Sequence, residues 1–128
     1  MNRDEKFIAL AKRIAKEAPS FGINKHCSII VRGRKIIGVG VNSKITHPAM
    51  LNSYTRDKIF LHSEVDALNA VRYKDIDGTT IYVARHSDAG ASMSKPCPIC
   101  IDKIRKSGIN KIVYSTNNGY KKEKVVNT

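Results

Sequence analysis

Two short motifs far apart in the sequence constrain the fold of this chain more than any other feature. The first is His62-Ser63-Glu64, and the second is Pro96-Cys97-Pro98-Ile99-Cys100, with residues 65–95 between them. One imidazole and two thiolates can bind zinc and leave its fourth position open for water, which is typical of a catalytic rather than a structural site. We therefore predict a fold that brings the motifs together, with Zn²⁺ bound by His62, Cys97 and Cys100.

The carboxylate of Glu64 is not required as a metal ligand, so it is available to move protons. Three alternatives compete with a catalytic metal, and one of them is chance co-occurrence of the two motifs. A redox C-x-x-C explains the cysteines but leaves the His-x-Glu motif unexplained. A structural zinc site needs a fourth ligand, for which Cys27 and His86 are the plausible spare donors. The joint occurrence of both motifs favours the catalytic interpretation.

Hydrophobic periodicity predicts a single α/β domain over residues 1–128. Apolar residues at helical spacing indicate a helix at 4–18, and two β-branched runs around Gly33-Arg34 indicate a hairpin. A β-strand, helix, β-strand segment from 79 to 115 has the length of a right-handed crossover, so its two strands should be parallel. The predicted helices are 4–18, 62–73 and 97–106, the strands are 26–32, 35–42, 79–85 and 109–115, and residues 116–128 form a frayed or weakly helical, flexible tail.

The combination of H-x-E with P-C-x-x-C is the signature of zinc-dependent nucleobase deaminases. On these motifs the chain resembles the cytidine and deoxycytidylate deaminase superfamily over residues 4–115. It looks most like deoxycytidylate (dCMP) deaminases and their phage relatives, because Gly40-Val41-Asn42 and a long loop precede H-x-E-V-D-A-L. The resemblance implies a three-layer α/β/α cytidine-deaminase fold with a mixed sheet. In the dCMP and tRNA adenosine deaminases the last two strands are parallel, whereas in nucleoside cytidine deaminases the last strand runs the other way.

The resemblance also implies an activity and a set of substrate contacts. The activity is hydrolytic conversion of dCMP to dUMP with release of ammonia, with Glu64 as the catalytic proton carrier. Asn42 matches the family's strand-end Asn, and the backbone N–H of Ser63 matches its donor to the base carbonyl, although the family usually has Ala there. A nucleotide phosphate needs a cation, for which the candidates are His47, Arg56, Lys58 and Lys95.

A net charge of +12 favours an anionic partner but does not say whether it is a small nucleotide or a long polynucleotide. The alternative function is therefore a polynucleotide deaminase that acts on single-stranded DNA or a tRNA loop. A catalytically silent zinc-bearing assembly subunit is a third interpretation, which the complete H-x-E motif disfavours. No apolar run suits a signal peptide or a membrane span, and three cysteines do not suit a disulfide scaffold. We expect a cytoplasmic protein without a membrane partner, and the resemblance implies a homo-oligomer.

Overall fold

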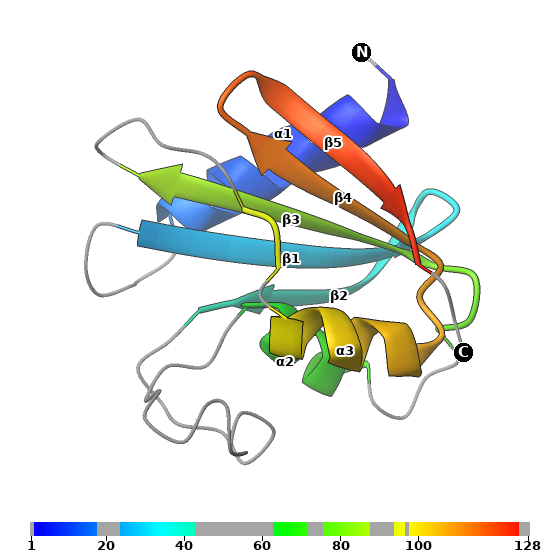
Figure 1. Ribbon diagram of the computed structural model, residues 1–128. Coiled ribbons are helices and arrows are strands. Elements are labelled where there is room, and N and C mark those ends of the chain that lie inside the picture. The colour runs from blue at the N-terminus through cyan, green and yellow to red at the C-terminus, as the bar shows by residue number, and fades with distance from the viewer. Residues whose placement is uncertain are drawn as a thin grey trace, which may run out of the picture.

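A five-stranded mixed sheet carries helices on both of its faces (Figure 1). The computed structural model describes residues 2–17, 24–42, 63–71, 76–87, 94–96 and 98–125. Along the chain the elements are α1 (Arg3–Glu17), β1 (Asn24–Arg32), β2 (Lys35–Val41), α2 (Ser63–Ala70), β3 (Thr80–Ser87), α3 (Pro98–Ser107), β4 (Lys111–Thr116) and β5 (Gly119–Lys124). Within these ranges no helix is long and apolar enough to cross a membrane.

The strands lie in the order β2-β1-β3-β4-β5. Strand β1 is antiparallel to β2 and to β3, while β3 and β4 are parallel. The predicted β-strand, helix, β-strand crossover is therefore confirmed, with α3 as its helix. The hairpin between β1 and β2 is confirmed as well, and its turn contains Gly33 at a φ of +63°, a value that glycine adopts without a steric cost.

Alternating side chains on the central strands supply two hydrophobic cores, one on each face of the sheet. On one face, Ile29 and Tyr82 pack with Phe7 and Ile8 of α1. On the other face, the core contains Ile30 together with side chains of α2 and α3. The architecture is thus the predicted three-layer α/β/α arrangement, with α1 alone on one side and α2 and α3 together on the other (Figure 1).

The prediction of a frayed or weakly helical tail was wrong, because residues Gly119–Lys124 form β5, which pairs antiparallel with β4. Its four charged residues hid the strand from pattern analysis, since Lys and Glu are depleted in strands. The pairing with buried β4 supplies the backbone partners, and Tyr120 and Val125 pack against the two cores. An Asn-Gly dipeptide at 118–119 was the available signal, because it is a common hairpin turn.

Candidate active site

Two glycines of β2 allow α2 to lie directly against the sheet. A Cβ atom built on Gly40 would be 2.2 Å from the backbone nitrogen of Ala67 and 2.4 Å from the backbone oxygen of Ser63. One built on Gly38 would be 2.5 Å from a methyl carbon of Val71. The Gly-x-Gly spacing puts both positions on one face of the strand, so this face accepts the helix backbone at a distance that no side chain permits.

This close packing places Glu64 in the first turn of α2, inside the protein. Glu64 is only 4% exposed, and its Oε1 accepts a hydrogen bond of 2.8 Å from the hydroxyl of Ser63. The first turn of a helix favours a carboxylate there, because its unsatisfied N–H groups carry partial positive charge. A buried carboxylate with few solvent contacts is the environment that a proton-transfer group requires.

The end of the second predicted motif forms the first turn of α3. Cys100 is fully buried in the first turn of α3, and this helix contacts α2. Ser94 anchors the segment that leads into the motif, since its hydroxyl donates to the backbone oxygen of Val83 at 2.8 Å and its N–H donates to that of Ser115 at 3.0 Å. The structure therefore brings Glu64 and Cys100 to the same face of the sheet, on neighbouring helices.

The two other predicted zinc ligands, His62 and Cys97, lie outside the described residues, next to Ser63 and Pro98 in the sequence. Among the residues that are described, no three potential ligands cluster. The chemistry of the site still fits zinc, because a buried thiol in the first helical turn lies on the helix that packs beside the one carrying the buried carboxylate. The ligand set stays a prediction.

The spare donors of a structural zinc site lie on the other face of the sheet. Cys27 packs in the core under α1, and burial together with the charge of Asp66 raises its pKa to about 12. Alternation along β3 puts His86 on the same side as Ala84, which also faces α1. Neither residue therefore shares the face of Cys100, and Cys27 is a buried apolar side chain rather than a ligand.

Asn42 follows β2 immediately, at the end of the sheet where Glu64 lies. Its side-chain oxygen accepts the backbone N–H of His26 at 2.9 Å, so the amide has a fixed orientation. Sequence reasoning missed a second contact that holds this strand end: Asp66 of α2 accepts the backbone N–H of Val41 at 3.0 Å. The sequence signal for it was a second carboxylate, two residues after Glu64 on the same predicted helix.

The predicted phosphate-binding cations are mostly outside the described residues. His47, Arg56 and Lys58 belong to that group. Lys95 is exposed, and its ammonium lies 3.3 Å from the carboxylate of Glu123 on β5. Its role in substrate binding, like that of Asn42 and Ser63, stays a prediction.

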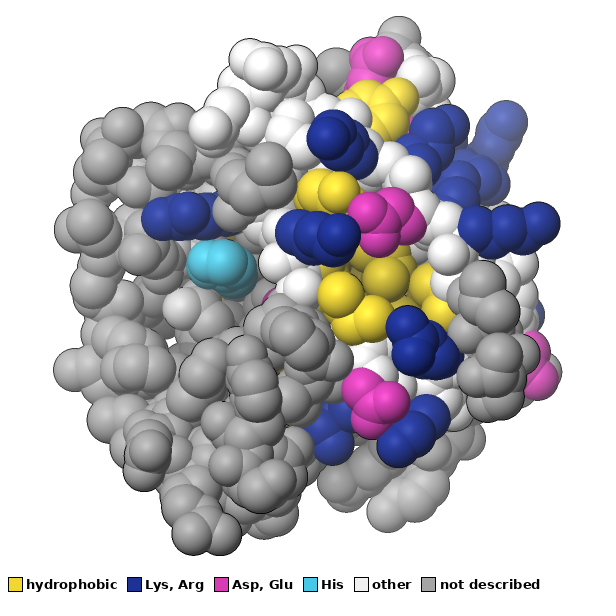
Figure 2. Space-filling model, viewed as in Figure 1, with side chains coloured by type: hydrophobic (Ala, Val, Ile, Leu, Met, Phe, Trp, Pro, Cys, Tyr) yellow, Lys and Arg dark blue, Asp and Glu magenta, His cyan; other side chains and the backbone are white. Residues whose placement is uncertain are grey.

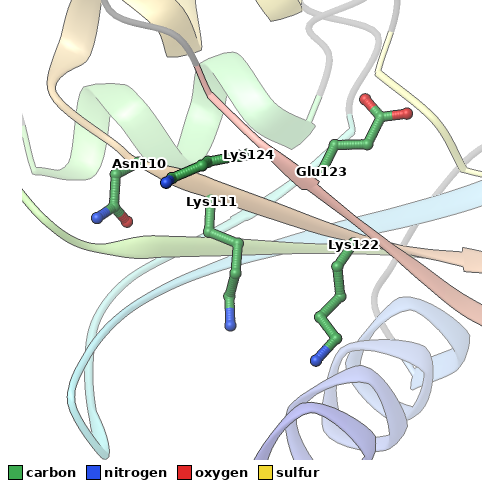
Figure 3. A pocket seen from close by; sticks show the side chains of 5 residues that line it. All are labelled: Asn110, Lys111, Lys122, Glu123 and Lys124. Atoms are coloured by element: carbon green, nitrogen blue, oxygen red, sulfur yellow. The ribbon is translucent and has the colours of Figure 1, made fainter.

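A shallow cavity of about 340 Å³ lies elsewhere, along β4 and β5 (Figure 3). Lys111 and Lys122 point from it toward α1, and both form ion pairs with Asp4, at 3.6 and 3.2 Å. The carboxylate of Asp4 therefore balances part of the positive charge of these two lysines. None of the motif residues that the structure describes lines the cavity; its lining residues are Asn110, Lys111, Lys122, Glu123 and Lys124.

Comparison with known proteins agrees with this geometry. A family model described as the cytidine and deoxycytidylate deaminase zinc-binding region matches residues 1–116. The chain belongs to this family. No curated protein matches it in sequence.

Solved structures of two kinds of deaminase share the fold of this family member. The apo crystal structure of dCMP deaminase from cyanophage S-TIM5 has 21% sequence identity and a TM-score of 0.62, covering 88% of this chain and 81% of that chain. The same enzyme in complex with dCMP and dUMP has 20% identity and a TM-score of 0.60, with coverage of 84% and 76%. Cytidine deaminase from Burkholderia pseudomallei has 14% identity and a TM-score of 0.62, with coverage of 94% and 91%.

The direction of the final strand does not support the dCMP branch over the nucleoside branch. The sequence argument counted β3 and β4 as the last two strands, and these are parallel as predicted. Within the described residues the unexpected β5 follows β4, and it runs antiparallel to β4. By the criterion given above, this is the arrangement of nucleoside cytidine deaminases.

Proposed function

We propose that this protein is a zinc-dependent hydrolase that deaminates a cytosine nucleotide, with dCMP as the substrate and dUMP and ammonia as the products. The observation that carries the proposal is the buried carboxylate of Glu64 in the first turn of α2, beside the helix that contains Cys100. Family membership and the fold shared with a phage dCMP deaminase support it.

The residues of the chain divide the chemistry between them. His62, Cys97 and Cys100 would hold zinc, which when bound lowers the pKa of a water molecule toward neutrality. Glu64 accepts a proton from the attacking water and donates it to the ring nitrogen beside C4. Glu64 then takes the remaining hydrogen of the hydroxyl added at C4 and delivers it to the C4 amine, so that the C4 oxygen becomes a carbonyl and ammonia leaves. Asn42 and the backbone N–H of Ser63 orient the nucleotide.

The antiparallel β4–β5 pair favours a second candidate, a deaminase that acts on the nucleoside. A panel of substrates separates the two candidates. We expect dCMP to show saturable turnover, with deoxycytidine reacting far more slowly because it lacks the phosphate. Equal turnover of deoxycytidine would overturn the nucleotide assignment and favour the nucleoside.

Single-stranded oligonucleotides in the same panel test the polynucleotide alternative. Lys and Arg side chains spread over the described part of one face rather than following a single track (Figure 2), which favours a small substrate. Uracil formation in oligonucleotides, with steeply salt-dependent binding, would instead favour the polynucleotide deaminase. Metal analysis of the same preparation tests for zinc, and zinc without deamination of any base would favour the silent subunit.

The predictions of cellular location and assembly state rest on the sequence and on its resemblance to the family. We propose a cytoplasmic homo-oligomer, in keeping with a small-molecule nucleotide as substrate. Size-exclusion chromatography with light scattering measures the assembly state directly.

A further inference from the structure

A buried chain of two hydroxyl groups ends on the carboxylate of Glu64. The hydroxyl oxygens of Ser28 and Ser63 are 2.8 Å apart, and the Ser63 hydroxyl donates to Glu64 Oε1, also at 2.8 Å. Both serines are completely buried. Ser28 comes from the middle of β1 and Ser63 from the first turn of α2, so the chain joins the rigid sheet to the predicted proton carrier.

The number of hydroxyl hydrogens determines which of the two serines donates to the other. A serine hydroxyl has a single hydrogen to donate, and that of Ser63 is used on Glu64. The hydrogen between the serines must therefore come from Ser28, which donates to Ser63. Hydrogen bonds in such a series polarise one another, so the first strengthens the second.

The backbone around Ser63 leaves little room for adjustment. The packing of the Ser63 carbonyl against Gly40 fixes the start of α2 on β2. Ser28 is held in turn by pairing with Gly40 on one side and Val83 on the other. The backbones of Ser28 and Ser63 are thus both fixed by packing and strand pairing.

We propose that Ser28 and Ser63 are positioning residues that hold the carboxylate of Glu64 in one orientation through the hydrogen bond to its Oε1. This inference rests on the proposed deaminase function. Its basis is the buried hydrogen-bond chain that runs from Ser28 through Ser63 to Glu64. A fixed rotamer keeps the carboxylate aligned in every turnover, which contributes to kcat rather than to substrate binding.

Steady-state kinetics of Ser63→Ala, Ser28→Ala and the double variant test the proposal, with the substrate that the wild-type zinc enzyme deaminates. We expect Ser63→Ala to lower kcat by about tenfold, with KM nearly unchanged. This size of effect is usual when a residue that orients a functional side chain is removed. Ser28→Ala should lower kcat by a smaller factor. Because Ser28 acts through Ser63, the double variant should be no slower than Ser63→Ala alone.

Thr79→Val is the matched control for the loss of a buried hydroxyl. The Thr79 side chain is 1% exposed and donates to the backbone oxygen of Ile76 at 2.6 Å, in the turn before β3. This variant should lose stability in thermal unfolding as the serine variants do, yet keep wild-type kcat. Zinc content is measured for each variant, so that a lost metal is distinguished from a misplaced carboxylate.

Three outcomes overturn the positioning role. The first is wild-type kcat in Ser63→Ala, and the second is an increase in KM without a fall in kcat. The third is a double variant whose loss is the product of the two single losses. Each of these leaves the proposed function intact, because the wild type is still active. A zinc-loaded wild type that deaminates no cytosine substrate overturns the proposed function, and the positioning role with it.

Discussion

Replacement of Gly40 by Ala tests whether the packing of α2 on β2 determines the position of Glu64. The φ angle at Gly40 is not in the left-handed region, so Ala meets no backbone penalty there and only the space is limiting. Its Cβ would lie 2.2 Å from the nitrogen of Ala67, whereas ordinary contact begins at 3.4 Å. The obstructing atoms are backbone atoms, so the helix itself has to move.

The displacement needed is about 1 Å at the first turn of α2, and a misplacement of that size costs about 100-fold in rate. Overpacking should also lower the free energy of unfolding by about 1–3 kcal/mol. We expect Gly40→Ala to reduce kcat by about 100-fold while the protein stays folded. Deamination is followed by ammonia release, and the free energy of unfolding is measured by equilibrium urea titration.

Gly38→Ala is the matched control on the same face of β2. Its Cβ would be 2.5 Å from a methyl carbon of Val71, which is a side-chain atom just beyond the end of α2 rather than a backbone atom of its first turn. This variant should therefore be destabilised but keep nearly wild-type kcat. If Gly40→Ala turns over as fast as Gly38→Ala, the close packing of α2 does not position Glu64, and the reasoning is refuted.

Three further substitutions, one of them with a matched control variant, test the proposed site and the stability of the fold. Glu64→Ala should keep its zinc and lose about 10²–10⁴-fold in kcat, because the proton carrier is gone; undiminished activity in a zinc-loaded preparation would reject the role of Glu64. Cys97→Ala should lose zinc, measured by elemental analysis, and melt at a lower temperature because metal and folding are coupled. Cys27→Ala is its control, since Cys27 faces α1, and loss of zinc from that variant would contradict the face assignment. Asp4→Asn should lower the free energy of unfolding at pH 7 by about 1.5–3 kcal/mol, because Asp4 accepts a 2.6 Å hydrogen bond from Tyr82 and pairs with two lysines.

The Asp4 prediction has a definite dependence on pH. Burial alone raises the pKa of Asp4, but the hydrogen bonds from Tyr82 and Lys122, with the charges of Lys111 and Lys122, hold this pKa below its usual 3.8. A carboxyl whose pKa is lowered by folding stabilises the protein above the unfolded value and loses that effect as the pH falls through the folded value. The loss of unfolding free energy caused by Asp4→Asn should therefore be largest at neutral pH and become smaller below about pH 4. Urea titrations across that pH range measure it.

Most of the element order could be predicted from the sequence, because apolar periodicity reflects local geometry. The helix at the N-terminus, the hairpin around Gly33 and the crossover through α3 all have patterns that repeat with the period of their own backbone. Strand β5 lacked such a pattern, since its charged side chains are stabilised by pairing with β4 and not by burial of its own residues. The direction of that strand, and with it the argument about the family branch, was therefore open until the sheet was known.

The sequence alone predicted the chemistry that we propose for this protein, because metal ligation and proton transfer depend on residue types and on short spacings that only a few functions require. The tertiary structure alone decided which groups surround that chemistry. The packing of α2 on the two glycines of β2 allows the hydrogen bonds between Ser28 and Ser63 and between Asp66 and Val41. The alternation of side chains along β1 places Cys27 on the face opposite to Cys100. Such contacts join residues far apart in the chain, and their partners follow from the packing of whole elements rather than from any local pattern.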